Sequence, residues 1–551
     1  MKHRHFTRWP IVEGYTEHRS FVPGEEIAVH ASSRAERVRV EVIRIGAERE
    51  LMWSSDITGI GEQPVPADAS SNGCGWPSSF TIPTQASWPS GFYEISFTAD
   101  ADADSGHDAG RADGGRLRSE AFFVLRGGKR PDLDPDFNSD SVKPVLVVLA
   151  TNTWNAYNQW GGACLYSGGH QVSFERPLER GYLRRIIEDD GFDGRVASAE
   201  VEPDPEHLRL QRYQADNDYP LWSASSGWHN WDRRFVAWAE RNGMALDFAI
   251  DADLDTDPDV GGNVVDGYSL VVTIGHSEYW TWGMRDTMDA YLAAGGNWVI
   301  FSGNTCFWQV RYQASTGVGA GAGTGREVMV GHKGRARFDD PVKGTDRRHL
   351  LTSMWSDPWI GRPENTTIGL SFSRGGYHRI GQGAPRGAGA YTVWRPDHWA
   401  LDGTDLRYGD QLGAGSFVVG YEVDGCALTL ENGLPVPTGE DSTPATLEVL
   451  ATAPARLLSI TDDHSEAPAA LWASTEPPGD LEGTAMVLFG GAEPEHVARL
   501  AHGRCVMGSF TAPGPSGGTV FNCGSADWAY GLDSDPLVGR ITANVITKLN
   551  R

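Results

Sequence analysis

LVVTIGHSEYW, residues Leu270–Trp280, joins an unbroken apolar run to a group of polar side chains. The run from 270 to 274 is typical of a strand that is buried on both faces of a sheet. After Gly275 the chain presents polar side chains, which include His276 and Glu278. Because these two residues lie two positions apart, they point to the same side of an extended segment.

A helix is predicted directly after this stretch. Thr281 is a residue type that caps helices, and Gly295-Gly296 ends the element. Between them, apolar residues recur at helical spacing: Met284, Met288, Tyr291 and Leu292. A buried strand that stops at polar residues and turns into a helix is how open α/β sheets present ligand sites.

The flanking sequence predicts parallel neighbours for this strand. Further apolar runs that suit buried strands lie at 144–150, 245–250 and 298–302. A helix is predicted at 231–242, and strands alternating with helices indicate a parallel sheet with covering helices. The loops after three of the strands carry Tyr157, His276 with Glu278, and Asn304. We therefore expect these side chains to meet at the carboxyl edge of one sheet.

The chain divides into segments of different character. Residues 1–128 alternate with period two and carry turn signals, which predicts an all-β domain, a β-sandwich. Residues 129–142 are rich in proline and aspartate and are read as a linker. Residues 143–551 predict an α/β catalytic domain with a flavodoxin-like, amidotransferase-like parallel sheet, and with a β-rich insertion at 325–480. Near its end the chain returns to α/β character, with apolar runs at 484–490 and 518–524 and a helix near 537–550.

Composition excludes several classes of function. The net charge of −26 over 551 residues argues against nucleic acid or an anionic membrane as a partner. No apolar run approaches the roughly 20 residues of a membrane helix, and the N-terminus lacks the apolar core of a signal peptide. The six cysteines include no CxxC pair, so we expect free, mostly buried thiols in a cytoplasmic protein.

The polar residues at the predicted sheet edge limit the chemistry. Ser277 follows a strand, but GHSEY is not the GxSxG nucleophile elbow. A zinc site would call for more histidine or cysteine. Tyrosine and glutamate together suit a hard, oxygen-preferring metal ion, and two phenolates with one carboxylate neutralise a trivalent ion.

Six segments carry a resemblance to a known family. In chain order they are TNTWNAYNQWGGACLY, VSFERP, GHSEYWTWGMRDTMDAYLAAGGNWVIFSGNTCFWQVR, MVGHKGRARFDDP, VVGYEVDG and GTVFNCGSADWAYGL. Together they resemble the family of the large subunit of N,N-dimethylformamidase, from about residue 143 to the end. The combination of GHSEYW and NAYNxWGG is the specific part of this resemblance.

The resemblance implies a mononuclear, non-haem Fe(III) site held by two tyrosines and one glutamate. Tyr157 matches the first tyrosine ligand and Glu278 the carboxylate ligand. His276 and Asn304 match the histidine and asparagine of the family's pocket. Residues that match its pocket lysine and second glutamate are Lys333 and Glu422.

The second tyrosine ligand is open at this stage. Relatives often carry a tyrosine directly after the Arg-Pro of VSFERP, but this chain has Leu178 there. Tyr182, four residues on, is the first choice for a substitute. Tyr166 and Tyr213 are the alternatives.

The sequence therefore predicts an iron-dependent amidohydrolase that cleaves a small N-substituted amide, such as N,N-dimethylformamide, by metal-activated water. We expect a homo-oligomer, with a small accessory subunit as an open possibility. A second interpretation keeps the fold and changes the substrate to a larger amide, held by aromatic walls at Trp154, Trp160, Trp280 and Trp308. A third is a non-catalytic binding or assembly module.

Overall fold

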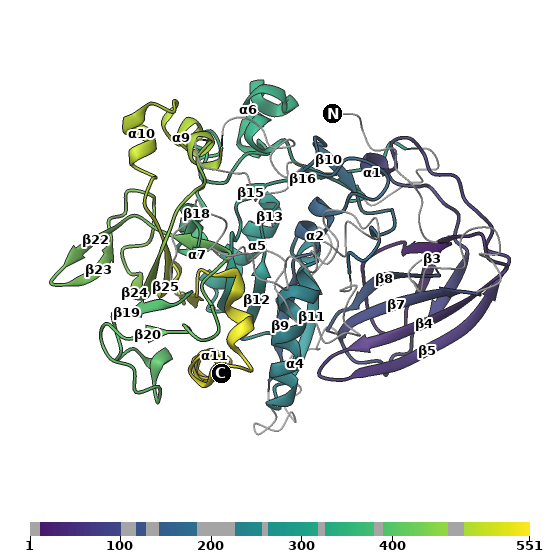
Figure 1. The fold of residues 1–551 in the computed structure, drawn as a ribbon, viewed down its shortest axis with the longest axis horizontal. Helices are drawn as coiled ribbons and strands as arrows, with labels where there is room; N and C mark the ends of the chain where they lie inside the picture. Colours follow the sequence, from purple (N-terminus) through teal and green to yellow (C-terminus); the bar gives the residue numbers. More distant parts are fainter. Residues whose placement is uncertain are drawn as a thin grey trace.

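A computed structural model describes residues 11–100, 117–127, 143–183, 226–255, 263–317, 325–378, 389–460 and 479–551. The chain is mixed α/β, with a β-rich N-terminal part beside a large mixed sheet (Figure 1). The predicted linker at 129–142 lies outside the described residues. The domain boundaries drawn from the sequence stay predictions.

Two sheets form the N-terminal part and share one apolar core. Val38, Val40 and Val42 of one strand all face this core, which is the period-two alternation that the sequence predicts. One sheet consists of β1 (Val12–Thr16), β3 (Glu26–Ser33) and β6 (Phe80–Pro83). The other consists of β2 (Ser20–Phe21), β8 (Arg118–Leu125), β7 (Gly91–Ala99), β4 (Arg37–Ile45) and β5 (Arg49–Thr58).

A nine-stranded sheet organises the rest of the chain. In spatial order its strands are β11 (Leu246–Ile250), β9 (Val145–Leu149), β12 (Leu270–His276), β14 (Asn297–Gly303), β26 (Thr519–Asn522), β25 (Gly503–Thr511), β24 (Glu448–Ala455), β19 (Tyr391–Val393) and β20 (Gln411–Leu412). From β11 to β26 neighbouring strands are parallel, and from β26 to β20 they are antiparallel. The parallel pairing predicted from the apolar runs is thus confirmed.

The order of the parallel strands creates a switch point. From β9 the chain moves outward to β11, then returns to β12 on the other side of β9 and continues to β14. Connections from β9 and β12 therefore leave the sheet in opposite directions. A crevice forms at such a point outside the carboxyl ends of the strands, where open α/β sheets bind ligands.

Both faces of this sheet are covered. One face packs against α4 (Arg233–Arg241), 3₁₀ helix η10 (Ala526–Gly531) and α11 (Pro536–Leu549). The opposite face packs against α5 (Trp282–Ala293), whose Met284, Met288 and Leu292 are buried as the sequence predicts. Thr281 caps α5 by accepting a hydrogen bond from the Met284 amide at 3.2 Å.

Two predicted segments differ from expectation. The sequence predicts a loop for the polar segment after β9, but this segment forms helix α2 (Thr151–Tyr157). The apolar run at 484–490 lies in helix α9 (Asp480–Phe489) and its C-cap, where no strand forms. In both segments, burial against neighbouring elements decides the local structure. The local sequence pattern does not contain this information.

The remaining elements are short. Small sheets pair β10 (Gln171–Ser173) with β17 (Val328–Val330) and β16 (Arg311–Gln313), β13 (Tyr279–Trp280) with β15 (Trp308–Gln309), β18 (Ser371–Tyr377) with β21 (Glu422–Gly425), and β22 (Leu428–Glu431) with β23 (Leu434–Pro437). The other helical segments are α1 (Ala69–Asn72), the π-helix η4 (Trp228–Asp232), η5 (Asp251–Leu254), η6 (Lys333–Arg335), α6 (Ala336–Asp339), η7 (Pro341–Gly344), η8 (Arg348–Leu350), α7 (Asn365–Ile368), η9 (Trp399–Leu401) and α10 (Pro494–Ala498).

Aromatic packing joins the N-terminal part to the large sheet. Phe92 of β7 stacks on Trp228 of η4 with ring centroids 3.9 Å apart. Phe122 of β8 packs edge-on against Trp154 of α2 at 5.3 Å. All four rings belong to the same buried cluster as the core residues of β9 and β12. The two parts of the chain therefore meet in one continuous apolar cluster, in addition to the separate core of the N-terminal sheets.

Two predictions from composition can be compared with the described residues. All six cysteines are buried and free, as expected. No helix in the described part of the chain has the length and apolarity that crossing a bilayer requires.

Candidate active site

The switch point of the large sheet brings together the polar residues singled out from the sequence. Helix α2 leaves the end of β9 and carries Tyr157 at its last position. His276 is the last residue of β12, and Glu278 follows two residues later. Asn304 comes directly after β14. The predicted convergence at the carboxyl edge of the sheet is observed.

Glu278 is the centre of the cluster. Its side chain is 2% exposed and accepts hydrogen bonds from two phenols. Tyr166 Oη lies 2.7 Å and 2.8 Å from the two carboxylate oxygens, and Tyr157 Oη lies 3.3 Å from Oε2. The two phenol rings stack with centroids 4.1 Å apart. The Glu278 amide donates to Thr153 Oγ1 of α2 at 2.9 Å, which ties the carboxylate segment to the helix that carries Tyr157.

His276 lies between two carboxylates. Its Nε2 is 3.3 Å from Glu278 Oε2 and 2.8 Å from Glu422 Oε2, although neither contact is aligned as a hydrogen bond. On the other side of the ring, Nδ1 lies 3.4 Å from the Tyr421 hydroxyl. Burial alone would lower the pKa of His276, but the Glu422 and Glu278 carboxylates raise it to about 9.

Asn304 and Lys333 adopt a backbone conformation that side chains rarely take, with φ of 51° and 52°. Asn304 Nδ2 donates to Glu422 Oε2 at 3.3 Å, while its Oδ1 accepts no hydrogen bond within the described residues. Lys333 Nζ lies 3.7 Å from the centroid of the Tyr166 ring. Non-glycine residues held at positive φ concentrate at functional sites, so both positions point to a constrained site.

Two glycines allow the close packing around the cluster. Gly275 has φ of +72°, and a Cβ there would lie 2.6 Å from Trp231. At Gly303 a Cβ would lie 2.3 Å from the Glu422 carbonyl oxygen and 2.6 Å from the Ala526 amide nitrogen. Only glycine lets the ends of β12 and β14 come this near to the segments that complete the site.

A family model described as "N,N-dimethylformamidase beta subunit-like, C-terminal" matches residues 39–542 of the chain. The chain belongs to this family. The N,N-dimethylformamidase beta subunit of Paracoccus aminophilus is 26% identical over 340 residues, which cover 58% of this chain and 36% of that protein. That of an Alcaligenes species is 26% identical over 219 residues, covering 36% and 25%. The matches therefore span about a third of the length of the first relative and a quarter of the second.

One solved structure resembles the chain only weakly. A cycloisomaltooligosaccharide glucanotransferase from Paenibacillus, in complex with cycloisomaltoheptaose, is similar at 10% identity with a TM-score of 0.16. That match covers 56% of this chain and 55% of the transferase. A TM-score this low carries no argument about the fold.

In this member of the dimethylformamidase family, hydrogen-bond distances decide which tyrosine lies beside Glu278 together with Tyr157. Tyr166, an alternative in the sequence analysis, is the phenol that reaches Glu278. The Tyr182 hydroxyl instead donates to the Trp154 carbonyl at 2.6 Å, inside the core. Tyr213 lies outside the described residues. The structure brings together every other predicted site residue, but it does not place Tyr182 with them.

The proposed aromatic walls are mostly elsewhere. Trp308 lies beside the site, with its ring centroid 5.7 Å from Lys333 Nζ. Trp280 packs against Trp298 in the apolar cluster that also contains the buried residues of α5. Trp154 packs against the N-terminal strands. Trp160 donates to Glu13 Oε2 at 2.8 Å.

Two further tyrosines complete the cluster and were not singled out from the sequence. Tyr279 donates to the Tyr166 hydroxyl at 2.8 Å, and Tyr421 contacts His276. Each directly neighbours a predicted acid, Glu278 or Glu422, in GHSEYW and GYEVDG. That adjacency was the available signal, but neighbours in a strand point to opposite faces, so adjacency alone does not predict a shared site.

The cluster can be compared with what a metal ion requires. Within the described residues, no group of three or more histidine, cysteine, aspartate or glutamate side chains is arranged to hold a metal ion. The available donors are therefore phenol oxygens with one carboxylate, from Tyr157, Tyr166 and Glu278. Oxygen ligands of one ion at about 2.0–2.2 Å lie about 3 Å from each other. The hydrogen-bonded separations of 2.7, 2.8 and 3.3 Å match that spacing.

Protonation of the phenols depends on a neighbouring cation. Burial and the charge of Glu278 raise the pKa of Tyr157 and Tyr166 well above 10. Both phenols are therefore protonated when no cation is present. A metal ion inverts this preference, because its charge stabilises the phenolate form.

Proposed function

We propose that this chain is an amide hydrolase that cleaves small N-substituted amides, of the size of N,N-dimethylformamide, with the help of one trivalent iron ion. The observation that carries the proposal is the convergence of Tyr157 and Tyr166 on the Glu278 carboxylate at the sheet's switch point. Family membership supports it, because the matched relatives are named N,N-dimethylformamidase beta subunits.

Tyr157, Tyr166 and Glu278 would hold the ion. Two phenolates and one carboxylate neutralise a 3+ charge, and hard oxygen donors suit a trivalent metal. When bound, the ion supplies Lewis-acid polarisation of the amide carbonyl and acidification of water. The stacked phenol rings and the Thr153 contact fix the three oxygens before any ion arrives.

Proton transfer falls to Glu422 and His276. The carboxylate of Glu422 accepts a proton from the attacking water, and Asn304 Nδ2 orients that carboxylate through its Oε2. His276, which the two carboxylates hold as an imidazolium, donates its proton to the leaving amine nitrogen and is then reprotonated by Glu422, whose Oε2 lies 2.8 Å away. Tyr421 at Nδ1 keeps the imidazole ring in this orientation.

Charge that develops on the amide oxygen needs a donor nearby. Lys333 supplies a positive charge above the Tyr166 ring, and its constrained backbone limits the positions that its side chain can take. A donor of this kind contributes about 3–4 kcal/mol to transition-state stabilisation in other hydrolases.

Fold type and assembly belong to the same proposal. The parallel strands follow the chain order 2-1-3-4-5, which supports a flavodoxin-like and amidotransferase-like sheet. The relatives are named as beta subunits, which supports an assembly that contains a second kind of subunit. Size-exclusion chromatography with light scattering of the purified chain measures its oligomeric state and tests this part.

The central experiment separates the metal-binding residues from the proton carriers. Glu278→Gln is expected to lose bound iron and visible absorption, whereas Glu422→Gln keeps both and loses kcat by at least about 100-fold. Tyr291→Phe is a matched control, since its hydroxyl contacts only the backbone carbonyls of Tyr268 and Asn297. Hydrolysis of N,N-dimethylformamide is compared with that of longer N-substituted amides. A colourless, iron-free preparation with full activity would contradict the proposal.

A further inference from the structure

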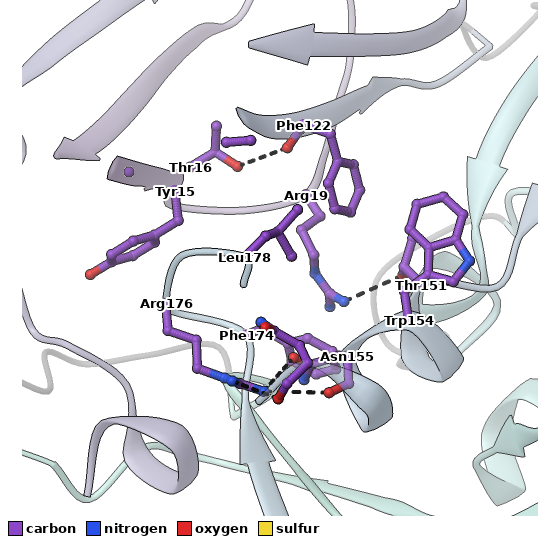
Figure 2. Close-up of a pocket in the computed structure, with 13 residues that line it drawn as sticks. Tyr15, Thr16, Arg19, Phe122, Thr151, Trp154, Asn155, Phe174, Arg176 and Leu178 are labelled. Carbon is purple, nitrogen blue, oxygen red and sulfur yellow. Dashed lines mark hydrogen bonds between the residues drawn. The ribbon is translucent and has the colours of Figure 1, made fainter. Parts of the chain in front are cut away.

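A cavity lies away from the cluster around Glu278, between the N-terminal strands and helix α2. It has a volume of about 40 Å³ and is lined by residues of β1 and β8, by α2, and by the segment from Phe174 to Leu178. Figure 2 shows the side chains of Arg19 and Arg176 reaching into the same space, from above and from the side. The residues that line the cavity include two arginines and no carboxylate.

Arg176 is a buried cation, 2% exposed, and its contacts among the described residues include no ion pair. All its donors are used, and all acceptors are neutral oxygens: the carbonyls of Ser173, Asn158, Trp160 and Asn155, and Asn155 Oδ1. Glu179 acts on its charge only from beyond ion-pair distance. A charge taken out of water is costly unless an opposite charge compensates it, so an anion near Arg176 is expected.

Arg19 adds a second positive charge to the cavity. Its guanidinium lies 3.3 Å from the centroid of the Phe174 ring, and Nη1 donates to Thr151 Oγ1 at 3.3 Å. No other acceptor for this guanidinium occurs in the described ranges. Asp251 accepts the Thr151 hydroxyl at 2.7 Å, and Asp251 and Asp253 act on the Arg19 charge from beyond ion-pair distance.

Asn155 supplies an unused donor in the wall of the cavity. Because a guanidinium only donates, the contact with Arg176 identifies the amide atom facing it as Oδ1. The remaining amide group, Nδ2, is buried and has no hydrogen-bond partner within the described residues. A buried polar group without a partner is rare in folded proteins and marks a place where a further acceptor fits.

We propose that this cavity binds a small carboxylate anion, of the size of formate or acetate. Arg19 and the Asn155 amide donate to its oxygens, and Arg176 compensates its charge from below. A carboxylate matches the planar donor fork of a guanidinium. A cavity of about 40 Å³ holds about three water-sized groups, which is the size of such an anion.

The bound anion would connect two parts of the chain. Arg19 belongs to the N-terminal part, whereas Asn155 lies on α2, two residues before Tyr157. Occupancy therefore holds α2 against the N-terminal strands and stiffens the helix that carries Tyr157. This inference does not depend on the proposed amide hydrolysis, because no residue of the Glu278 cluster lines the cavity.

The test replaces sodium chloride by sodium formate at constant ionic strength and follows thermal unfolding of the full chain. Wild-type protein is expected to show a saturable rise in Tm, and calorimetry of the native protein one formate site per chain. Arg19→Gln should raise the formate concentration at half-effect by at least tenfold. Arg499→Gln, which removes an exposed guanidinium 4.0 Å from the Phe489 ring, is the matched control and should respond as wild type.

A further variant separates this cavity from the metal-binding cluster. Glu278→Gln should keep the formate response, whether or not the protein hydrolyses amides. Loss of the response in Glu278→Gln together with its retention in Arg19→Gln would place formate at the other site and overturn the proposal. Absence of a formate site in calorimetry of the wild-type protein, or a Tm that does not change when formate replaces chloride, would overturn it as well.

Discussion

Replacing Tyr166 by phenylalanine removes one hydroxyl and its contacts to both Glu278 oxygens, at 2.7 and 2.8 Å. A hydrogen bond to a charged group contributes about 1.5–3 kcal/mol, and the metal-free protein should lose stability within that range. The effect on iron binding is larger. Loss of a residue that only supports a ligand weakens metal affinity about 10–100-fold, so loss of a direct ligand should exceed that.

Tyr182→Phe is the matched control, because it removes the same atom from the phenol that the sequence favours as the second ligand. The Tyr182 hydroxyl donates to the Trp154 carbonyl at 2.6 Å, deep in the core. Its removal leaves a buried acceptor without its partner and costs about 1–3 kcal/mol of stability. Iron content and visible absorption should stay at the wild-type level, since no contact joins Tyr182 to Glu278.

The assay measures iron per chain by mass spectrometry, visible absorption of the loaded protein, and urea unfolding of the metal-free protein. Similar losses of stability with opposite effects on iron content are the expected pattern. If Tyr182→Phe releases iron while Tyr166→Phe retains it, the reasoning from the separations around Glu278 is wrong. If both variants retain iron equally, neither Tyr166 nor Tyr182 is a ligand of the iron.

Two further predictions concern the framework. Gly303→Ala places a Cβ 2.3 Å from the Glu422 carbonyl oxygen, so we expect the free energy of unfolding in urea to fall by about 1–3 kcal/mol and kcat to decrease. Gly344→Ala is the control and should be neutral, because no atom lies within 4 Å of the added Cβ. Equal effects of the two substitutions would contradict the predicted clash at Gly303. Burial raises the pKa of Glu364 from 4.5 to about 7. Between these two values the folded state binds more protons than the unfolded state. The free energy of unfolding therefore falls as pH rises through this range, by up to about 3 kcal/mol. Glu364→Gln should abolish this part of the pH dependence, and an unchanged difference between pH 5 and pH 8 would count against it.

Much of the framework follows from local patterns in the sequence. The apolar run before His276 is long enough to predict a strand buried on both faces, and the cap at Thr281 marks the following helix. A spacing of two residues placed His276 and Glu278 on one side, and their side chains lie 3.3 Å apart. Periodicity and capping act over a few residues, which is why they can be read directly.

Other parts of the site depend on contacts that local patterns do not encode. Helix α2 is rich in asparagine and threonine, which are weak helix formers, and it forms because most of its residues are buried. Tyr166 reaches Glu278 because the chain folds back over α2 after Tyr157 and stacks one phenol on the other. Glu422 enters from β21, more than a hundred residues further along the chain, and its approach depends on the absence of a side chain at Gly303. None of these three follows from spacing alone.

The stacked rings of Phe92 and Trp228 have a consequence for how the protein can be divided. A fragment that starts at residue 143 would carry Trp154 and Trp228 into water, stripped of the phenylalanines that cover them. Such a fragment is expected to aggregate, because exposed aromatic surface promotes association between chains. A recombination point between the two parts would therefore expose aromatic surface that each part now covers for the other.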